Sequence, residues 1–285
     1  MAETIAFYGT GMLGSGFVKS LRRHGYDVHV WNRTRENALH LEANGAKVFS
    51  DAADAARGAS RVHICVRDDA SVDAVLDQAL PGIAQTAAIV DHTTVLPENV
   101  PGRAARLASS GYAFMHAPVF MSPAGAAQSD GTMLVSGPTT LYERMSSALE
   151  QMAGRVIYFG EQPDIAAVYK LMGNSIILGL IGTVKDTFSI GEANGLKPSE
   201  AYRLFDFFSP QAQIDGRVKR MSQGDFAPMW GLDMAHKDAQ LMLAAAPERN
   251  LPVIRTVERE LRSASDQGLG NKDLGAVLEA RTTAA

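Results

Sequence analysis

This chain of 285 residues has little cysteine, no excess of positive charge and no histidine cluster. Its one cysteine, Cys65, excludes an intramolecular disulfide and a thiolate metal cluster. The seven histidines are scattered, with no pair spaced to share a helical face, so we expect no bound metal. The formal net charge of −4 does not supply the positive field on which nonspecific nucleic-acid binding depends. Nucleic acid is therefore not an expected partner.

The sequence also shows no basic leader, and it contains one long apolar segment. The first residues, Met1 to Thr4, carry no basic n-region, so we expect a cytoplasmic protein. Residues 165–184 are mostly apolar over about the length that a bilayer requires, yet Lys170 and Asn174 interrupt them. A lysine at mid-bilayer costs about 2.5–3.5 kcal/mol on insertion scales. We therefore expect no membrane partner and a helix that is buried on all sides inside the protein.

Short β-rich segments alternate with helical patterns through the first half of the chain. Strands are predicted at Thr4–Tyr8, Asp27–Trp31, Val62–Val66, Ala88–Asp91, Tyr112–Pro118, Thr132–Ser136 and Val156–Phe159. Helices are predicted between them at Met12–His24, Arg35–Asn44, Val72–Leu80 and Glu98–Ser109. Because parallel strands need crossovers that cover the sheet, this alternation predicts an α/β fold with a doubly wound parallel sheet.

After residue 160 the strand pattern stops and helical patterns follow. One very long helix is expected from Asp164 to about Asn194, where Asn194-Gly195 suits a left-handed C-terminal cap. Further helices are predicted at Ser199–Phe208, Ile214–Gln223, Met234–Ala245, Val253–Gln267 and Leu274–Arg281. We therefore predict a dinucleotide-binding α/β domain over residues 1–163 and an all-helical domain over residues 164–285.

A glycine-rich segment joins the first predicted strand to the first predicted helix. It satisfies G-x-G-x-x-G, which binds dinucleotides when it stands between a strand and a helix. Gly9 allows the tight turn, Gly11 admits a pyrophosphate to the backbone, and Gly14 lets the helix pack on the strand. A plain structural turn is the alternative. We assign the whole segment to a cofactor site: Gly9, Thr10, Gly11, Met12, Leu13 and Gly14.

The end of the second predicted strand suits a phosphorylated ribose. An NAD-preferring site places Asp or Glu here for the ribose 2′-hydroxyl, but this chain has Asn32, Arg33 and Thr34. A carboxylate would repel a 2′-phosphate, whereas a guanidinium can bind one through two hydrogen bonds. Thr34 is expected to cap the next helix and to add a hydroxyl contact. We therefore expect NADP(H) in preference to NAD(H), with an ordinary surface Arg33 as the alternative. Val66 and Arg67, at the end of the third predicted strand, are assigned to the same cofactor site.

A lysine lies in an apolar part of the long predicted helix. Lys170 and Asn174 are four residues apart and share one helix face. A lysine among apolar neighbours must pair, reach solvent or do chemistry. Desolvation lowers the pKa of an amine, which suits a group that exchanges a proton near neutral pH. From the pattern alone, a general acid or base and a lysine that reaches solvent are equally open interpretations.

Taken in their order along the chain, these motifs resemble the β-hydroxyacid dehydrogenases. That group includes 3-hydroxyisobutyrate dehydrogenase and glyoxylate/succinic semialdehyde reductase. The resemblance covers the whole chain. Besides the glycine loop, it depends on Asn32-Arg33-Thr34, Asp91-His92-Thr93-Thr94, His116-Ala117-Pro118-Val119, Lys170-Leu171-Met172-Gly173-Asn174 and Lys237-Asp238. It implies an N-terminal Rossmann domain, a long inter-domain helix, an all-helical C-terminal domain and a homodimer or homotetramer.

The resemblance also implies roles for individual residues. Lys170 matches the general acid/base of the family, and Asn174 matches the asparagine that orients the substrate. Thr93 and Thr94 match the pair beside the nicotinamide, and Lys237 matches the lysine that closes over cofactor and substrate. Thr93 and Lys237 are therefore expected at the cofactor, and Thr94 and Lys237 at the substrate.

The segment that should hold the substrate departs from the family pattern. Where the family usually has Asp-Ala-Pro-Val-Ser-Gly-Gly, residues 116–122 are His-Ala-Pro-Val-Phe-Met-Ser. Phe120 and Met121 are bulky and apolar where Ser and Gly would let the backbone close on an anion. We assign both to the substrate site, with Ser122 as a replacement hydroxyl. A larger or less charged carbonyl compound suits such a lining.

The imine reductases resemble this chain as well. They share its architecture, the stretch Trp-Asn-Arg-Thr and the use of NADPH, but they commonly have Asp or Tyr at the position of Lys170. Retention of Lys170 with Asn174 favours the hydroxyacid type, whereas the altered loop and the neighbouring Tyr169 favour the imine type.

We predict an NADPH-dependent oxidoreductase that moves a hydride between the nicotinamide and a small-molecule carbonyl or alcohol substrate, with Lys170 as general acid/base. The expected type is a β-hydroxyacid dehydrogenase-like semialdehyde or ketoacid reductase. An imine reductase-like enzyme that reduces C=N is the alternative. A non-catalytic NADPH-binding sensor is a third possibility, against which Lys170 and Asn174 both count, since a sensor needs neither.

Overall fold

The computed structural model describes residues 2–281, and the chain divides into two compact units, residues 1–174 and 175–285. The division falls inside the long helix α8, Ile165–Ala193. The last strand of the first unit ends at Tyr158, and Ala167 of α8 belongs to a core of that same unit. The domain boundary near residue 163 stays a prediction. Each unit is described below by itself.

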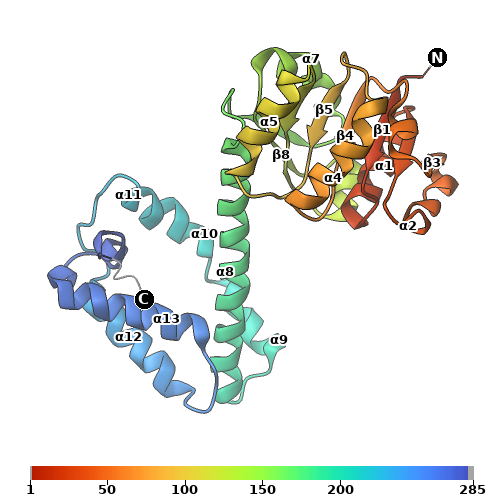
Figure 1. The fold of residues 1–285 in the computed structure, drawn as a ribbon. Helices are drawn as coiled ribbons and strands as arrows, with labels where there is room; N and C mark the ends of the chain where they lie inside the picture. The colour runs from red at the N-terminus through yellow and green to blue at the C-terminus, as the bar shows by residue number, and fades with distance from the viewer. Residues whose placement is uncertain (1, 282–285) are drawn as a thin grey trace. The chain divides into compact units, whose positions relative to one another are not determined.

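A six-stranded parallel sheet forms the centre of the first unit (Figure 1). Its order is β3-β2-β1-β4-β5-β6, the doubly wound Rossmann arrangement in which strand order reverses between β1 and β4. The predicted fold class is confirmed. The strands are β1 Thr4–Tyr8, β2 Asp27–Trp31, β3 Lys47–Phe49, β4 Arg61–Ile64, β5 Ala88–Asp91 and β6 Ala113–His116. The helices are α1 Met12–Arg23, α2 Glu36–Leu39, α3 Ala52–Ala56, α4 Asp69–Ala79, α5 Asn99–Ser109, α6 Pro123–Gln128 and α7 Thr139–Glu150.

The central strands β1, β4 and β5 of this sheet are buried on both faces. In β1, Ile5 and Phe7 belong to a core with α1 and α7, whereas Ala6 and Tyr8 belong to a second core with α3, α4 and α5. Side chains of a strand alternate between faces, so a strand between two helical layers is apolar without a break. This explains why β1, β2, β4 and β5 were recognisable as short apolar segments.

A second, three-stranded sheet follows the first. It consists of β7 Val119–Phe120, β8 Thr132–Val135 and β9 Arg155–Tyr158, with β7 antiparallel and β9 parallel to β8. The prediction of one continuous strand over Tyr112–Pro118 is therefore wrong at its end. The chain leaves the first sheet after His116, and Pro118, which has no N–H group, lies in the crossing to β7.

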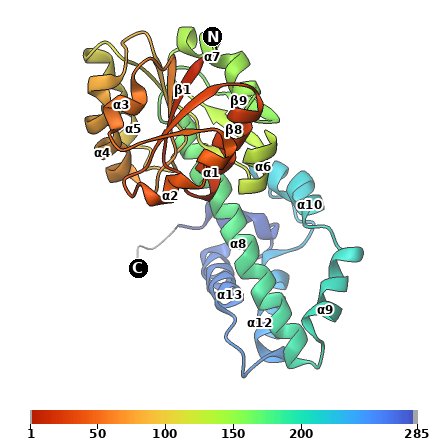
Figure 2. The same ribbon diagram turned by 90° about the vertical axis from the view of Figure 1, so that its right-hand side faces the viewer.

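The described part of the second unit is helical, as predicted. Its helices after α8 are α9 Pro198–Ala201, α10 Pro210–Gln213, α11 Lys219–Met221, α12 Leu232–Ala245 and α13 Pro252–Ala264. Shorter 3₁₀ or π turns lie at Tyr202–Asp206, Ile214–Val218, Ser265–Leu269 and Leu274–Glu279. Helices α12 and α13 lie side by side (Figure 2), and their contact buries Leu232, Ala235 and Leu261.

Helix α8 corrects one expectation. Its apolar side chains are not buried within the single chain: Ile176 is 66% exposed, Leu178 73% and Ile181 64%. By length and composition, α8 is the one helix in residues 2–281 that is long and apolar enough to cross a membrane. The expectation of a helix buried on all sides was wrong because hydropathy indicates that a surface needs a cover, not which molecule supplies it.

A hydrogen-bonded chain of polar side chains runs through the core of the first sheet. The Nδ1 atom of His92 is 2.7 Å from the carbonyl oxygen of Ala117, which can only accept, so Nδ1 carries the proton. The Nε2 atom of a neutral His92 then accepts from Nδ1 of His63 at 2.9 Å. Nε2 of His63 accepts in turn from Nε of Arg61 at 3.2 Å. Both imidazoles are therefore neutral and have fixed tautomers.

Burial lowers the pKa of both histidines, that of His92 to about 4, although Ala117 and Asp91 act in the opposite direction there. The unfolded chain takes up protons on these histidines below about pH 6.5, and the folded chain does not. The free energy of unfolding should therefore fall as the pH drops from 6.5 toward 4, by up to about 1.4 kcal/mol per pH unit for each histidine.

Urea unfolding at pH 7, 6 and 5 measures this loss. His92→Gln should lower stability at pH 7 but flatten the pH dependence, because one of the two titrating groups is gone. His40→Gln, at an exposed position, is the control and should keep the parental slope. An unchanged slope in His92→Gln would contradict the assignment.

Candidate functional site

The glycine loop packs backbone against backbone at the carboxyl edge of the sheet. Gly9 has a φ of +93°, and a Cβ on it would overlap the carbonyl oxygen of Cys65. A Cβ on Gly14 would overlap the carbonyl oxygen of Gly9. Both positions therefore require glycine for packing. Gly11 differs, since a Cβ there would have no heavy atom within 4 Å.

A hydrogen-bonded bridge joins this loop to the end of β2. The amide of Asn32 donates from Nδ2 to the Thr10 hydroxyl at 2.8 Å, and its Oδ1 accepts from the backbone N–H of Thr34 at 3.0 Å. The Thr10 hydroxyl donates to the carbonyl oxygen of Asn37 at 3.0 Å. Asn32 thus holds the turn that carries Arg33 against the loop. The expected cap by Thr34 was wrong: α2 begins one residue later, with Arg35 at its N-cap and no side-chain capping bond.

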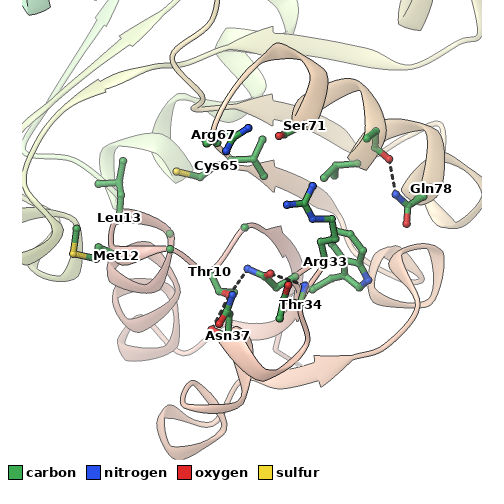
Figure 3. Close-up of a pocket in the computed structure, with 18 of the residues that line it drawn as sticks. Thr10, Met12, Leu13, Arg33, Thr34, Asn37, Cys65, Arg67, Ser71 and Gln78 are labelled. Carbon is green, nitrogen blue, oxygen red and sulfur yellow. Dashed lines mark hydrogen bonds between the residues drawn. The ribbon is translucent and has the colours of Figure 1, made fainter.

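A pocket of about 520 Å³ lies along the glycine loop (Figure 3). Of the residues predicted to bind cofactor, the pocket is lined by Gly9, Thr10, Gly11, Met12, Leu13, Gly14, Asn32, Arg33, Thr34, Val66 and Arg67. Sequence reasoning missed the other side chains that line it: Trp31, Asn37, Cys65, Ser71, Ala74, Val75, Gln78 and Pro123. Four of these lie on α4, which reaches the pocket through tertiary packing, so no local motif marks them.

Two arginine side chains give the rim of the pocket a positive charge. The side chains of Arg33 and Arg67 both border it (Figure 3). Within residues 2–281, Arg67 pairs with Asp68, Nε to Oδ2 at 2.9 Å, whereas no ion pair or hydrogen bond is formed by the exposed Arg33 guanidinium. Gly11, at the N-cap of α1, has no side chain that could cap the helix, so the first N–H groups of α1 have no side-chain partner where residues 11–14 line the pocket. Free donors at a helix start and an unpaired guanidinium are what a phosphorylated dinucleotide needs.

The end of β5 adds Thr93 to the edge beside the pocket. The Thr93 hydroxyl accepts from the backbone N–H of Val66 at 3.1 Å, and the backbone N–H of Thr93 donates to Oδ1 of Asp91 at 2.9 Å. Asp91 therefore orders the loop after its strand. Thr93 is buried and does not line the pocket, whereas Thr94 is exposed.

Lys170 lies half-buried on the second turn of α8, with the ring of Phe120 beside it. Its Nζ atom is 4.2 Å from the centroid of that ring. Burial lowers the pKa of Lys170 below its ordinary value. Among residues 2–281, no carboxylate lies within ion-pair distance of Nζ, and the contact of Nζ with the Phe120 ring is a cation–π contact. Asn174, one turn further along α8, is also half-buried. The amine is thus partly desolvated and has an aromatic face, rather than an anion, for a neighbour.

The loop after Phe120 has a structural use for Ser122. Its hydroxyl oxygen accepts from the backbone N–H of Gly125 at 3.0 Å and caps α6. Met121, between the two, is half-buried. The substrate-binding roles of Phe120, Met121 and Ser122 stay predictions, and so does that of Lys237. Lys237 lies on α12 of the second unit, exposed and paired with Asp238 at 2.8 Å.

A glycine loop between β1 and α1, at the point where strand order reverses, defines a dinucleotide-binding domain. Residues 4–160, more than half of the chain, match the family described as the NAD binding domain of 6-phosphogluconate dehydrogenase. The chain belongs to this family, a dehydrogenase and reductase family that binds NAD or NADP.

Three similar proteins show what this chain resembles. Glyoxylate/succinic semialdehyde reductase 1 of Arabidopsis thaliana is 25% identical over 97% of this chain and 97% of its own length. The cytokine-like nuclear factor N-PAC of Homo sapiens is 28% identical over 98% of this chain, which spans 51% of that protein. The imine reductase from Myxococcus stipitatus in complex with NADP⁺ has a TM-score of 0.91 at 21% identity, over 97% of this chain and 99% of that one. The resemblance stated from the sequence is confirmed.

Gly11 separates ligand binding from folding. Because a Cβ on Gly11 meets nothing in the protein, Gly11→Ala should keep the parental thermal unfolding temperature. It should weaken dinucleotide binding at least tenfold, since the methyl group lies where the pyrophosphate approaches the backbone. Calorimetric titration with NADPH and a thermal melt measure the two effects.

Gly14→Ala is the contrasting variant, and its overlap with the carbonyl of Gly9 should lower the unfolding temperature itself. Parental NADPH affinity in Gly11→Ala would show that the pocket along the loop is not where the dinucleotide binds.

Proposed function

We propose that this protein is an NADPH-dependent reductase or dehydrogenase that acts on a small carbonyl or alcohol compound, with Lys170 as its general acid/base. The observation that carries the proposal is the state of Lys170: a half-buried amine with a lowered pKa and no carboxylate partner within residues 2–281. A lysine kept only for structure would gain by pairing or by reaching water. The full-length similarity to a semialdehyde reductase supports the same reaction class.

Lys170 would handle the proton in this chemistry. In reduction its ammonium donates a proton to the carbonyl oxygen as that oxygen becomes an alkoxide, and in oxidation the neutral amine takes the proton back. The positive charge also stabilises the developing oxyanion, which is worth several kcal/mol in a site that excludes water. Asn174, one helical turn away, holds the oxygen in line. NADP(H), when bound, supplies or accepts the hydride.

The residues of the pocket fit NADP(H). Gly11 leaves open space beside the backbone, the start of α1 offers free N–H groups, and the unpaired Arg33 suits a 2′-phosphate. No carboxylate stands at position 32, where Asp or Glu would repel that phosphate. These features support NADP(H) in preference to NAD(H).

Two further candidates follow from the similar proteins. The fold shared with the Myxococcus stipitatus imine reductase supports reduction of C=N as the alternative reaction, in which Lys170 would protonate or face a nitrogen instead of an oxygen. The similarity to N-PAC, named as a nuclear factor, supports a non-catalytic module that binds the dinucleotide.

The exposed apolar side chains of α8 support the predicted homodimer or homotetramer, in which a second copy would cover them.

Replacement of Lys170 tests the catalytic role. Lys170→Ala should keep NADPH affinity and lower the turnover number by roughly 10²–10⁴, the usual contribution of a positioned acid or base. NADPH oxidation is followed against semialdehydes, ketoacids, ketones and cyclic imines. Lys185→Ala is the matched control, because Lys185 lies on the same helix and is exposed.

The same set of compounds also distinguishes between the three proposed functions. Turnover of the cyclic imines alone would favour an imine reductase, and no turnover of any compound despite NADPH binding would favour a non-catalytic dinucleotide-binding module. Full activity in Lys170→Ala would refute the role given to this lysine.

Replacement of Arg33 tests the cofactor preference. The parent enzyme should have a higher kcat/KM with NADPH than with NADH. Arg33→Asp should lower kcat/KM for NADPH by at least tenfold, because a carboxylate repels the 2′-phosphate, and should leave the value for NADH within a few-fold. Arg35→Asp, two residues on and outside the pocket, is the control. A parent that prefers NADH would contradict the assignment.

A further inference from the structure

The ring of Phe120 is enclosed between two positions of the same helix. It lies 4.2 Å from Nζ of Lys170, and its edge lies against Gly173, three residues further along α8. A Cβ on Gly173 would lie 2.7 Å from Cε1 of the ring and would overlap Cζ. Residues three apart share a helix face, so Lys170 and Gly173 together form the seat of the ring. Only glycine at position 173 admits the ring this close.

The backbone that carries Phe120 is anchored on both sides. Phe120 is the last residue of β7 and pairs with Thr132 of β8. Two residues later Ser122 caps α6, and α6 packs on α1 so closely that a Cβ on Gly16 would lie 2.5 Å from the carbonyl oxygen of Pro123. The ring is therefore held by a paired strand and a capped helix, not by a free loop.

The ring and the burial act on the amine in opposite directions. Burial removes water from Lys170 and favours the neutral form. The face of an aromatic ring attracts the ammonium and favours the charged form, without forming a hydrogen bond to any of its three N–H groups. A carboxylate at the same place would hold the proton far more firmly and would occupy donors that a substrate needs.

We propose that Phe120 is the positioning residue for Lys170, which its ring keeps charged and correctly aimed, and that Gly173 is required in order to admit the ring. The inference depends on the proposed function, since it gives Lys170 the part of proton donor. Phe120 is one of the residues by which this chain departs from the usual hydroxyacid-dehydrogenase loop, and the proposal gives it a part in setting the charge state of the catalytic acid.

The other titratable groups near Lys170 do not contact its amine, so Phe120 is the group that we expect to act on its charge. On its own helix and just before it are Tyr169, stacked on Phe159, and Asp164. Strands β5 and β6 share a core with Ala167 of α8 and end at Asp91 and His116. The Nδ1 atom of His116 lies 3.5 Å from Oδ2 of Asp91. None of these groups is within ion-pair distance of Nζ, and burial is the one cause of the shift in the pKa of Lys170.

The first experiment measures the charge state of Lys170 directly. The extent of acetylation of Lys170 by a brief pulse of acetic anhydride, measured by mass spectrometry from pH 6 to 11, gives its titration midpoint. Phe120→Leu should lower this midpoint by about 0.5–1.5 pH units, and Phe120→Tyr should restore the parental value, because it keeps the aromatic face. Phe159→Leu is the matched control: it removes a ring that stacks on Tyr169 and not on Lys170.

The same variants are then assayed for reduction. Reduction requires the ammonium, so the fall of kcat/KM at high pH should move to lower pH in Phe120→Leu by the same amount as the acetylation midpoint. Phe159→Leu should keep the parental profile. An unmoved midpoint in Phe120→Leu would overturn the proposal.

A second pair of variants does not depend on the folding of Phe120→Leu. Gly173→Ala should displace the ring and lower the midpoint of Lys170, while Phe120→Ala/Gly173→Ala should match Phe120→Ala alone, because the added methyl group then meets no ring. Equal shifts caused by Gly173→Ala in the presence and absence of the Phe120 ring would overturn the proposal.

The two hypotheses fail separately. If Lys170→Ala retains full turnover while Phe120→Leu still shifts the acetylation midpoint, the catalytic role is wrong and the charge control by Phe120 stands. If Lys170→Ala loses turnover and neither Phe120→Leu nor Gly173→Ala moves the midpoint, the catalytic role stands and the part given to Phe120 is wrong.

Discussion

The close contact of main chain with main chain at the β1–α1 turn determines the geometry of the whole cofactor edge. Gly9 lies against the carbonyl of Cys65 and Gly14 against the carbonyl of Gly9, so main-chain atoms at the ends of β1 and β4 and at the start of α1 are in direct contact. Short polar side chains extend this contact outward. Asn32 reaches the Thr10 hydroxyl and thereby fixes the turn that presents Arg33, and the Thr93 hydroxyl joins the end of β5 to Val66. The edge of the pocket is therefore held by main-chain contacts and short polar side chains, and the guanidinium of Arg33 is left free for a ligand.

A second constraint connects this edge with the loop that carries Phe120. The polar chain that ends at the carbonyl of Ala117 crosses β4 and β5 inside the core, where unpaired polar atoms are costly. Each imidazole has both ring nitrogens satisfied, and burial keeps both neutral. Because β7 begins two residues after Ala117, the hydrogen bond from His92 to Ala117 fixes the direction in which the backbone leaves the sheet toward Phe120. The core thus contributes to the site through hydrogen bonds between buried histidines and the backbone.

The parts of the fold that could be predicted are those with a strong local pattern. Strands such as β1 and β5 are apolar on both faces, and the glycine loop stands directly between a strand and a helix, so both were recognisable from the sequence. The short strand β3 and helix α6 were missed, because β3 is a three-residue edge strand and α6 begins at a Pro in a segment treated as a loop. The wall formed by α4 could not be foreseen either, because Ser71 and Gln78 reach the pocket through packing between distant segments. Hydropathy located α8 correctly but left open what covers it.

An ammonium in a desolvated place can be stabilised by an anion or by the face of a ring, and the choice has chemical consequences. A carboxylate neutralises the charge, takes up N–H donors and makes the proton hard to release. A ring supports the charge weakly and leaves every donor available, so the amine stays acidic enough to give its proton to a forming alkoxide. In this chain the ring comes from β7 and the amine from α8, and a glycine one turn along the helix makes room for their contact. The acid strength of Lys170 is then set by a strand residue that no helical motif contains. This would let the loop change while the lysine and asparagine of the helix stay the same.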